Sequence, residues 1–118
     1  MIVRKITERT INPSSYEVLS LQEKNDIDAF INQSIKVAYK AGKTFRVGDY
    51  VGRKVFPTWS NTPLDPIYQY HKRIGTINPS KQAGIDVGHL FKNAMDTSSF
   101  CFEIHKDHVN YYTPIYRA

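Results

Sequence analysis

Residues 20–42, SLQEKNDIDAFINQSIKVAYKAG, carry the strongest structural signal in the chain. Ser20 and Glu23 have the spacing of a capping box, in which each residue's side chain satisfies a free backbone amide of the other. Gly42 is a natural helix stop. The pattern predicts an amphipathic helix from about Ser20 to Ala41. One face of it should carry the positions that recur every three or four residues: Ile27, Phe30, Ile31, Ser34, Ile35 and Ala38.

Short strands are predicted on both sides of this helix. Upstream, the apolar patch at residues 2–6 predicts a strand, and the turn-favouring residues 12–15 follow it. Downstream, hydrophobic residues alternate from Phe45 to Val55, which predicts a strand with a kink at Gly48.

The next part of the chain is predicted to be less regular. Residues 57–66 contain three prolines, which cannot donate to a sheet, so this stretch is predicted to be a long loop or an excursion at a sheet edge. Residues 74–77 have the pattern of a short strand. Residues 86–94 then predict a second, shorter helix with Asp86 as its cap.

The C-terminal residues 100–112 alternate between apolar and polar side chains, which predicts a β-hairpin. If Lys106 and Asp107 form its tip, Phe102 faces Tyr111 and Ile104 faces Val109. The opposite face of the hairpin would then carry the polar set Glu103, His105, His108, Asn110 and Tyr112.

Together these elements predict an α+β fold in a single domain, residues 1–118. The N-terminal amphipathic helix is expected to pack on a small, bent antiparallel sheet. Residues 1–42 would hold a strand, a turn and the helix, and residues 43–118 mainly antiparallel strands with one short helix. The chain has 118 residues, of which 41% are hydrophobic, and this is enough to bury one core.

Two short stretches resemble a known kind of barrel. Residues 45–51, FRVGDYV, followed downstream by residues 74–77, IGTI, resemble the opening of SH3-like barrels of the KOW and Tudor-like kind. The resemblance implies that the sheet closes into such a barrel and that the first loop contacts a partner. That loop is longer here than is usual, and it would expose Trp59, Tyr68 and Tyr70.

Positive charge is concentrated in the middle of the chain. Residues 36–73 hold eight Lys and Arg against two acidic residues and include seven of the fifteen aromatic side chains. Bases release phosphate counterions and aromatic rings offer faces for stacked nucleobases. We therefore predict a non-enzymatic module that contacts nucleic acid. The predicted contacts are Arg46, Arg53, Lys54, Trp59, Tyr68, Tyr70, His71, Lys72 and Arg73.

Two other functions fit the same sequence. A protein-interaction module that regulates or inhibits a larger partner is one, because Tyr and Trp are also preferred interface anchors. A small metal-independent RNase is the other, with Glu103, His105 and His108 sharing acid and base roles. Those residues and Cys101 lack an established zinc-ligand spacing, so neither a metal nor a cofactor is predicted.

Cys101 is the single cysteine, which excludes an internal disulfide and favours a reducing compartment, the cytoplasm. Residues 1–9 lack the apolar stretch of a secretory signal. Nowhere do about 18 apolar residues run together as a membrane span requires. The sequence leaves the oligomeric state open.

Overall fold

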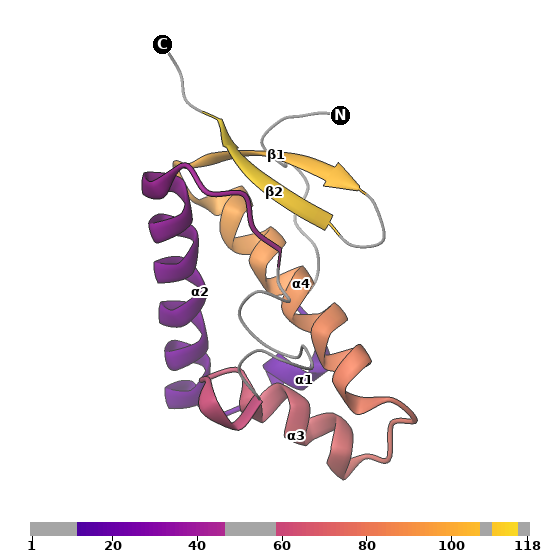
Figure 1. Cartoon of the computed structure of the whole chain (residues 1–118). Coiled ribbons are helices and arrows are strands. Elements are labelled where there is room, and N and C mark those ends of the chain that lie inside the picture. Colours follow the sequence, from indigo (N-terminus) through magenta and orange to yellow (C-terminus); the bar gives the residue numbers. More distant parts are fainter. Residues whose placement is uncertain (1–11, 47–58, 107–109, 116–118) are drawn as a thin grey trace.

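The computed structural model describes residues 12–46, 59–106 and 110–115. This part of the chain is mostly helical with a two-stranded antiparallel sheet, so the α+β class is confirmed. The elements are α1 (Ser14–Glu17), α2 (Leu21–Ala41), the 3-10 turn η2 (Trp59–Asn61), α3 (Asp65–Arg73), α4 (Pro79–Thr97), β1 (Cys101–Lys106) and β2 (Asn110–Ile115). The β1–β2 hairpin lies over the upper ends of α2 and α4, and α1 and α3 lie at their lower ends (Figure 1).

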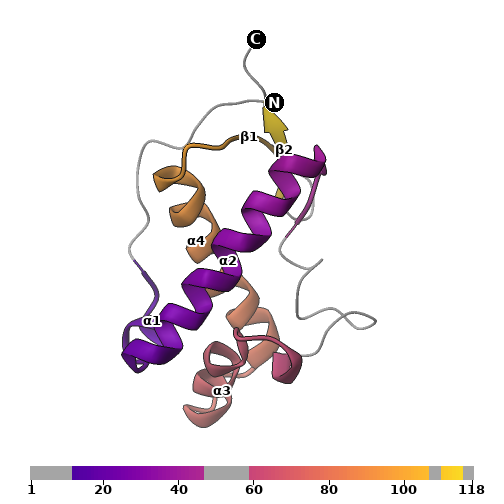
Figure 2. The same cartoon turned by 90° about the vertical axis from the view of Figure 1, so that its left-hand side faces the viewer.

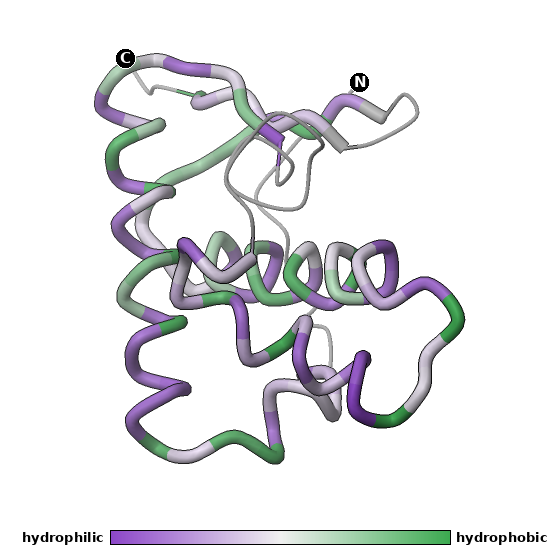
Figure 3. The backbone as a smooth tube through the Cα atoms, turned by 60° about the horizontal axis from the view of Figure 1, so that its bottom comes forward, coloured by the Kyte–Doolittle hydropathy of each residue, from purple (hydrophilic) through white to green (hydrophobic). Residues whose placement is uncertain are grey.

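Helix α2 follows the sequence prediction closely. The Ser20 side chain accepts a hydrogen bond from the Glu23 backbone at 3.1 Å, and the Glu23 side chain accepts one from the Ser20 backbone at 3.1 Å. Gly42 ends the helix in the left-handed conformation, with φ of 65°. Figure 2 shows α2 running from α1 to the hairpin in front of α4. Hydrophobic and hydrophilic positions alternate around α2 and α4, as expected for helices with one face in the core (Figure 3).

The predicted loop over residues 57–66 is wrong at its end, where α3 begins. Within it, η2 is followed by the start of α3 at Asp65, and Pro66 lies in the first turn of that helix. Proline is suited to this position because the first helical amides have no partner in the helix. The predicted strand over residues 74–77 is also wrong: these residues form the turn between α3 and α4, where Gly75 has φ of 79°.

Helix α4 is longer than predicted. It begins at Pro79, after Asn78, whose side chain accepts a hydrogen bond from the Lys81 backbone at 3.3 Å. Asp86 is therefore a buried residue inside the helix and not its cap. Because α3 and α4 occupy more of the described C-terminal part than the strands do, the expectation of mainly strands over residues 43–118 is also corrected.

The hairpin exists, but its register differs from the predicted one. Phe102 pairs with Pro114 and Ile104 with Tyr112, and residues 107–109 connect the strands. The prediction assumed a connection of two residues. With three residues between the strands, the side chains of β2 that were predicted to face solvent face the core instead. Tyr112, predicted on the polar face, is therefore 3% exposed and lies in the core.

Phe45 joins α2 to the hairpin. It forms an isolated bridge with Tyr112, with backbone hydrogen bonds of 2.9 and 2.7 Å. Its buried ring lies 5.7 Å from Phe102 and 5.9 Å from Phe91, measured between ring centroids. An aromatic core thus lies where α2, α4 and the sheet meet. In the described residues the sheet has two strands and this bridge, and an SH3-like barrel is not shown.

Two predicted strands fall outside the described residues in whole or in part. The strand at residues 2–6 lies outside entirely. Of the strand predicted over residues 45–55, the structure describes Phe45 and Arg46 alone.

Candidate nucleic-acid interface

The predicted basic and aromatic contacts converge most closely on α3. Tyr68, Tyr70, His71, Lys72 and Arg73 all lie on this helix, with the bases in its last turn. Positive side chains at a helix C-terminus complement the helix dipole, which favours this local structure. The five residues therefore lie on a helix and not on the loop that the resemblance implied.

Trp59 and Tyr68 form a stack beside α3. Their rings are nearly parallel, at an angle of 6°, and their centroids are 5.6 Å apart. Trp59 is 6% exposed, and its indole nitrogen donates a hydrogen bond to the Ser80 hydroxyl at 3.1 Å. Its ring therefore fastens η2 to α3 and α4, and it does not offer an open face to a nucleobase.

The two bases of α3 lie against aromatic rings. The Lys72 ammonium is 5.6 Å from the ring centre of Tyr68, and the Arg73 guanidinium is 6.0 Å from that of Tyr70. Both bases are exposed, and neither forms an ion pair with another described residue. Their positive charges are therefore not neutralised by carboxylates in this part of the chain.

His71 differs from its neighbours because it is buried. Its Nε2 atom lies 2.6 Å from Oδ2 of Asp86, and its Nδ1 atom lies 3.0 Å from the Thr76 hydroxyl. Oδ2 of Asp86 also accepts a hydrogen bond from the Ser15 hydroxyl at 2.7 Å. The imidazole is thus part of a buried polar network, away from any ligand that binds the exposed bases.

The other predicted contacts are not gathered on α3. Arg46 is half-buried beside the hairpin, where its guanidinium is 5.8 Å from the ring centre of Tyr111 on β2. Arg53 and Lys54 lie outside the described residues. Five of the predicted contact residues therefore lie together on α3, whereas Arg46 lies beside the hairpin.

The hairpin residues predicted for the RNase alternative are only partly described. Glu103 and His105 follow each other on one face of β1, with 3.8 Å between Oε1 and Nε2. Their side chains are 40% and 57% exposed, so the contact is a weak surface one. His108 lies outside the described residues. Among the residues that are described, no three His, Cys, Asp or Glu side chains converge as a metal site would require.

Helix α4 contributes residues that sequence reasoning missed. Lys81, Ile85, His89 and Lys92 recur at helical spacing, and all lie outside the buried stripe of the helix. Lys81 was missed because the predicted helix began at Asp86. The sequence does contain a signal for the true start, since Asn at the cap followed by Pro is a typical helix beginning.

No family model, no curated protein and no solved structure matches the chain. Within the residues that the structure describes, no helix is both long and apolar enough to span a membrane.

Proposed function

We propose that the chain is a nucleic-acid-binding module that binds duplex DNA through α3, α4 and the turn between them. Two helices joined by a short turn that contains glycine are typical of a helix-turn-helix. Here the turn runs from Ile74 to Asn78 and contains Gly75. In that motif the second helix enters the major groove of DNA.

The elements around the two helices support this comparison. Along the chain, α2 is followed by the bridging residue Phe45, then by α3, α4 and the β1–β2 hairpin. In space, β2 lies between β1 and the bridge. This arrangement resembles that of winged helix-turn-helix domains. An analogy of fold raises the expectation of DNA binding but does not supply the function.

The observation that carries the proposal is the charge around the turn. Lys72 and Arg73 precede it and Lys81 follows it, all three exposed and without an ion pair in the described residues. Bases that carry no carboxylate partner neutralise phosphates and release their counterions. Lys92 extends the positive charge along α4, whose outward side could then face the groove.

The test is fluorescence anisotropy of a labelled DNA duplex at about 50 and 200 mM salt, with a single strand for comparison. The double variant Lys72→Ala/Arg73→Ala should weaken binding by roughly tenfold or more and lower the salt slope by about two. The matched control is Lys36→Ala/Lys40→Ala, which removes the same charge from exposed positions on α2. Equal losses in both double variants would refute the assignment to α3.

One observation favours the protein-interaction alternative. Ile77 is fully exposed at 101% and Ile74 is 58% exposed, so the turn presents two isoleucines to solvent. Contiguous exposed apolar surface with polar residues around it marks protein contacts, and these two isoleucines belong to one turn. Under this alternative, the parent protein does not bind DNA, and Ile77→Ser abolishes its binding to a protein partner. Trp59 is the wrong residue for that test, because it is buried and its loss would disturb the fold.

A further inference from the structure

A small cleft of about 200 Å³ opens between α1, α2 and α4. It lies behind the outward side of α4, so it is separate from the proposed DNA-binding surface. Its polar lining consists of Asn12, Tyr16, Asp28, Asn32, Asn93 and Thr97. Its apolar lining includes Ile31 and Leu90, which are 2% and 6% exposed.

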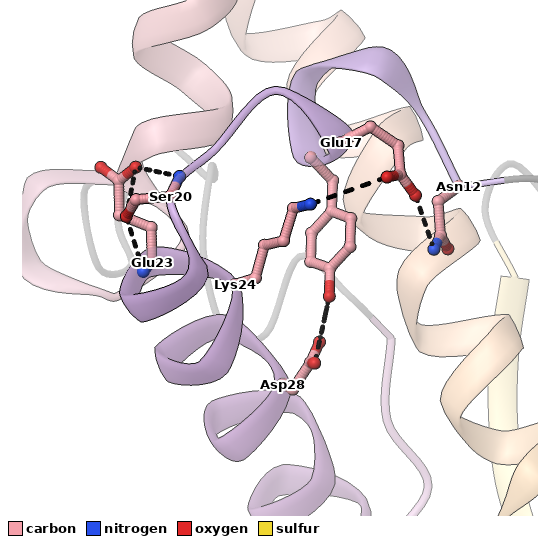
Figure 4. Close-up of polar contacts among 7 residues, drawn as sticks. Asn12, Glu17, Ser20, Glu23, Lys24 and Asp28 are labelled. Atoms are coloured by element: carbon pink, nitrogen blue, oxygen red, sulfur yellow. Dashed lines mark hydrogen bonds and ion pairs between the residues drawn. The ribbon is translucent and has the colours of Figure 1, made fainter.

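The carboxylate of Asp28 is held in a fixed orientation at this cleft. The Tyr16 hydroxyl donates to both of its oxygens, at 2.9 and 3.0 Å (Figure 4). Burial, assisted by the hydrogen bond to Asp28, raises the pKa of Tyr16 to about 12, so the hydroxyl keeps its proton at neutral pH. A carboxylate that is preorganised in this way binds a ligand with less loss of side-chain freedom.

Contacts beside the cleft hold Asn12, one of its lining residues, in place. Glu17 and Lys24 form an ion pair at 3.7 Å, so their charges largely cancel. The Asn12 side chain donates to Glu17 at 3.1 Å and accepts from the Asn93 side chain at 2.9 Å. Figure 4 shows Glu17 between Lys24 and Asn12, with dashed lines to both.

The cleft therefore combines one negative charge with hydrogen-bond acceptors and an apolar floor. Asp28 is the charged residue of the lining, and no Lys or Arg lines it. Asn32 lies one helical turn beyond Asp28 and makes no side-chain hydrogen bond to another described residue. Its amide oxygen is thus a second acceptor beside the carboxylate.

We propose that this cleft binds a small organic cation, an ammonium or guanidinium group on a short aliphatic stem. The cationic group would donate to Asp28 and Asn32, because hydrogen bonds between charged groups are stronger than neutral ones. The stem would lie against the buried side chains of Ile31 and Leu90, which form the apolar floor of the cleft. This inference does not depend on the proposed DNA binding.

The probe for the test is n-butylammonium, with n-butanol as an uncharged probe of similar shape. Titration into the isotopically labelled full chain is followed by the backbone amide signals of Asp28, Asn32 and Leu90. Saturable shifts with butylammonium and much weaker shifts with butanol are expected. Shifts that do not saturate, or that are equal with both probes, would overturn the proposal.

Two variants make the test specific. Asp28→Asn keeps an acceptor for Tyr16 and removes the charge, and it should weaken butylammonium binding about tenfold, which corresponds to about 1.4 kcal/mol. Asp26→Asn is the matched control, since Asp26 is exposed on the same helix and its carboxylate accepts from Gln22. It should change the affinity less than about twofold. Equal weakening by the two variants would show a general charge effect and refute the site.

Discussion

His71 of α3 and Asp86 of α4 are joined by a contact of 2.6 Å between Nε2 and Oδ2, and each residue is 7% exposed. Because Oδ2 also accepts the hydroxyl proton of Ser15, Nε2 is the donor of the pair. In the neutral ring, Nδ1 then accepts from the Thr76 hydroxyl. The Asp86 carboxylate thus holds α1 and α3 to α4, and His71 in turn holds Thr76 of the turn between α3 and α4.

Replacing Asp86 should destabilise the fold strongly. Asp86→Ala leaves His71 and Ser15 buried without their acceptor, and we expect a loss of about 3 kcal/mol in the free energy of unfolding, measured in urea. Asp96→Ala on the same helix is the control, because Asp96 is half-buried and makes no hydrogen bond or ion pair within the described residues. Similar losses in both variants would mean that the buried network contributes little.

Phe45 should be one of the most sensitive core positions. Phe45→Ala removes a ring that is 1% exposed and contacts both α4 and the hairpin, so we expect a loss of about 3 to 5 kcal/mol in urea unfolding. Val37→Ala, at a residue that is 54% exposed on α2, should cost less than about 1 kcal/mol. A small effect at Phe45 would contradict its place in the core.

Tyr16 should ionise at a higher pH than an ordinary tyrosine. Its folded-state pKa of about 12 exceeds the usual 10.0, so the folded state favours the protonated hydroxyl. The resulting stabilisation is complete below pH 10 and is lost as pH rises toward 12. Ultraviolet titration should show a tyrosine step near pH 12, and Tyr16→Phe should lower the amplitude of that step by one tyrosine. An unchanged amplitude of that step in the variant would contradict the assignment to Tyr16.

Glycines of α4 and of the preceding turn should respond in opposite directions to alanine. Gly84 lies inside α4 with open space where a methyl group would point, so Gly84→Ala should stabilise the fold by about 0.5 to 1 kcal/mol. Gly75 has φ of 79°, so Gly75→Ala should destabilise it by about 1 kcal/mol despite similar open space. Thermal unfolding of both variants measures the difference, and changes of the same sign would contradict it.

Local signals made α2 predictable, whereas the start of α3 was hidden by Pro66 and the two prolines before it. Ser20 and Glu23 interact across the first turn of the helix, and Gly42 acts on its last turn. Because each signal is local, sequence spacing alone identifies the two helix ends. Pro66 excludes a strand but is equally suited to the first turn of a helix, and spacing does not distinguish this from a loop. The packing of Trp59 on Tyr68 stabilises the helical conformation of α3. Because this is a tertiary contact, sequence spacing does not reveal it.

The candidate interface was predictable only where its residues can be recognised without knowing the helix bounds. Lys72 and Arg73 were found because a cluster of like charges is visible in any conformation. Lys81 was not, because its role depends on where α4 begins and on which side of the helix is buried. The hairpin register also depended on a detail that alternation cannot supply, namely the number of residues between the strands.

The pairing of Phe45 with Tyr112 has a consequence for synthesis of the protein on the ribosome. The hydroxyl of Tyr39 likewise donates to the backbone of Ile115, 76 residues later in the chain. Translation therefore completes α2, α3 and α4 before β2, the strand that closes the aromatic core, leaves the exit tunnel. Until then the nascent chain carries Phe45 without the strand that pairs with it, and a hydrophobic surface left open during synthesis favours aggregation.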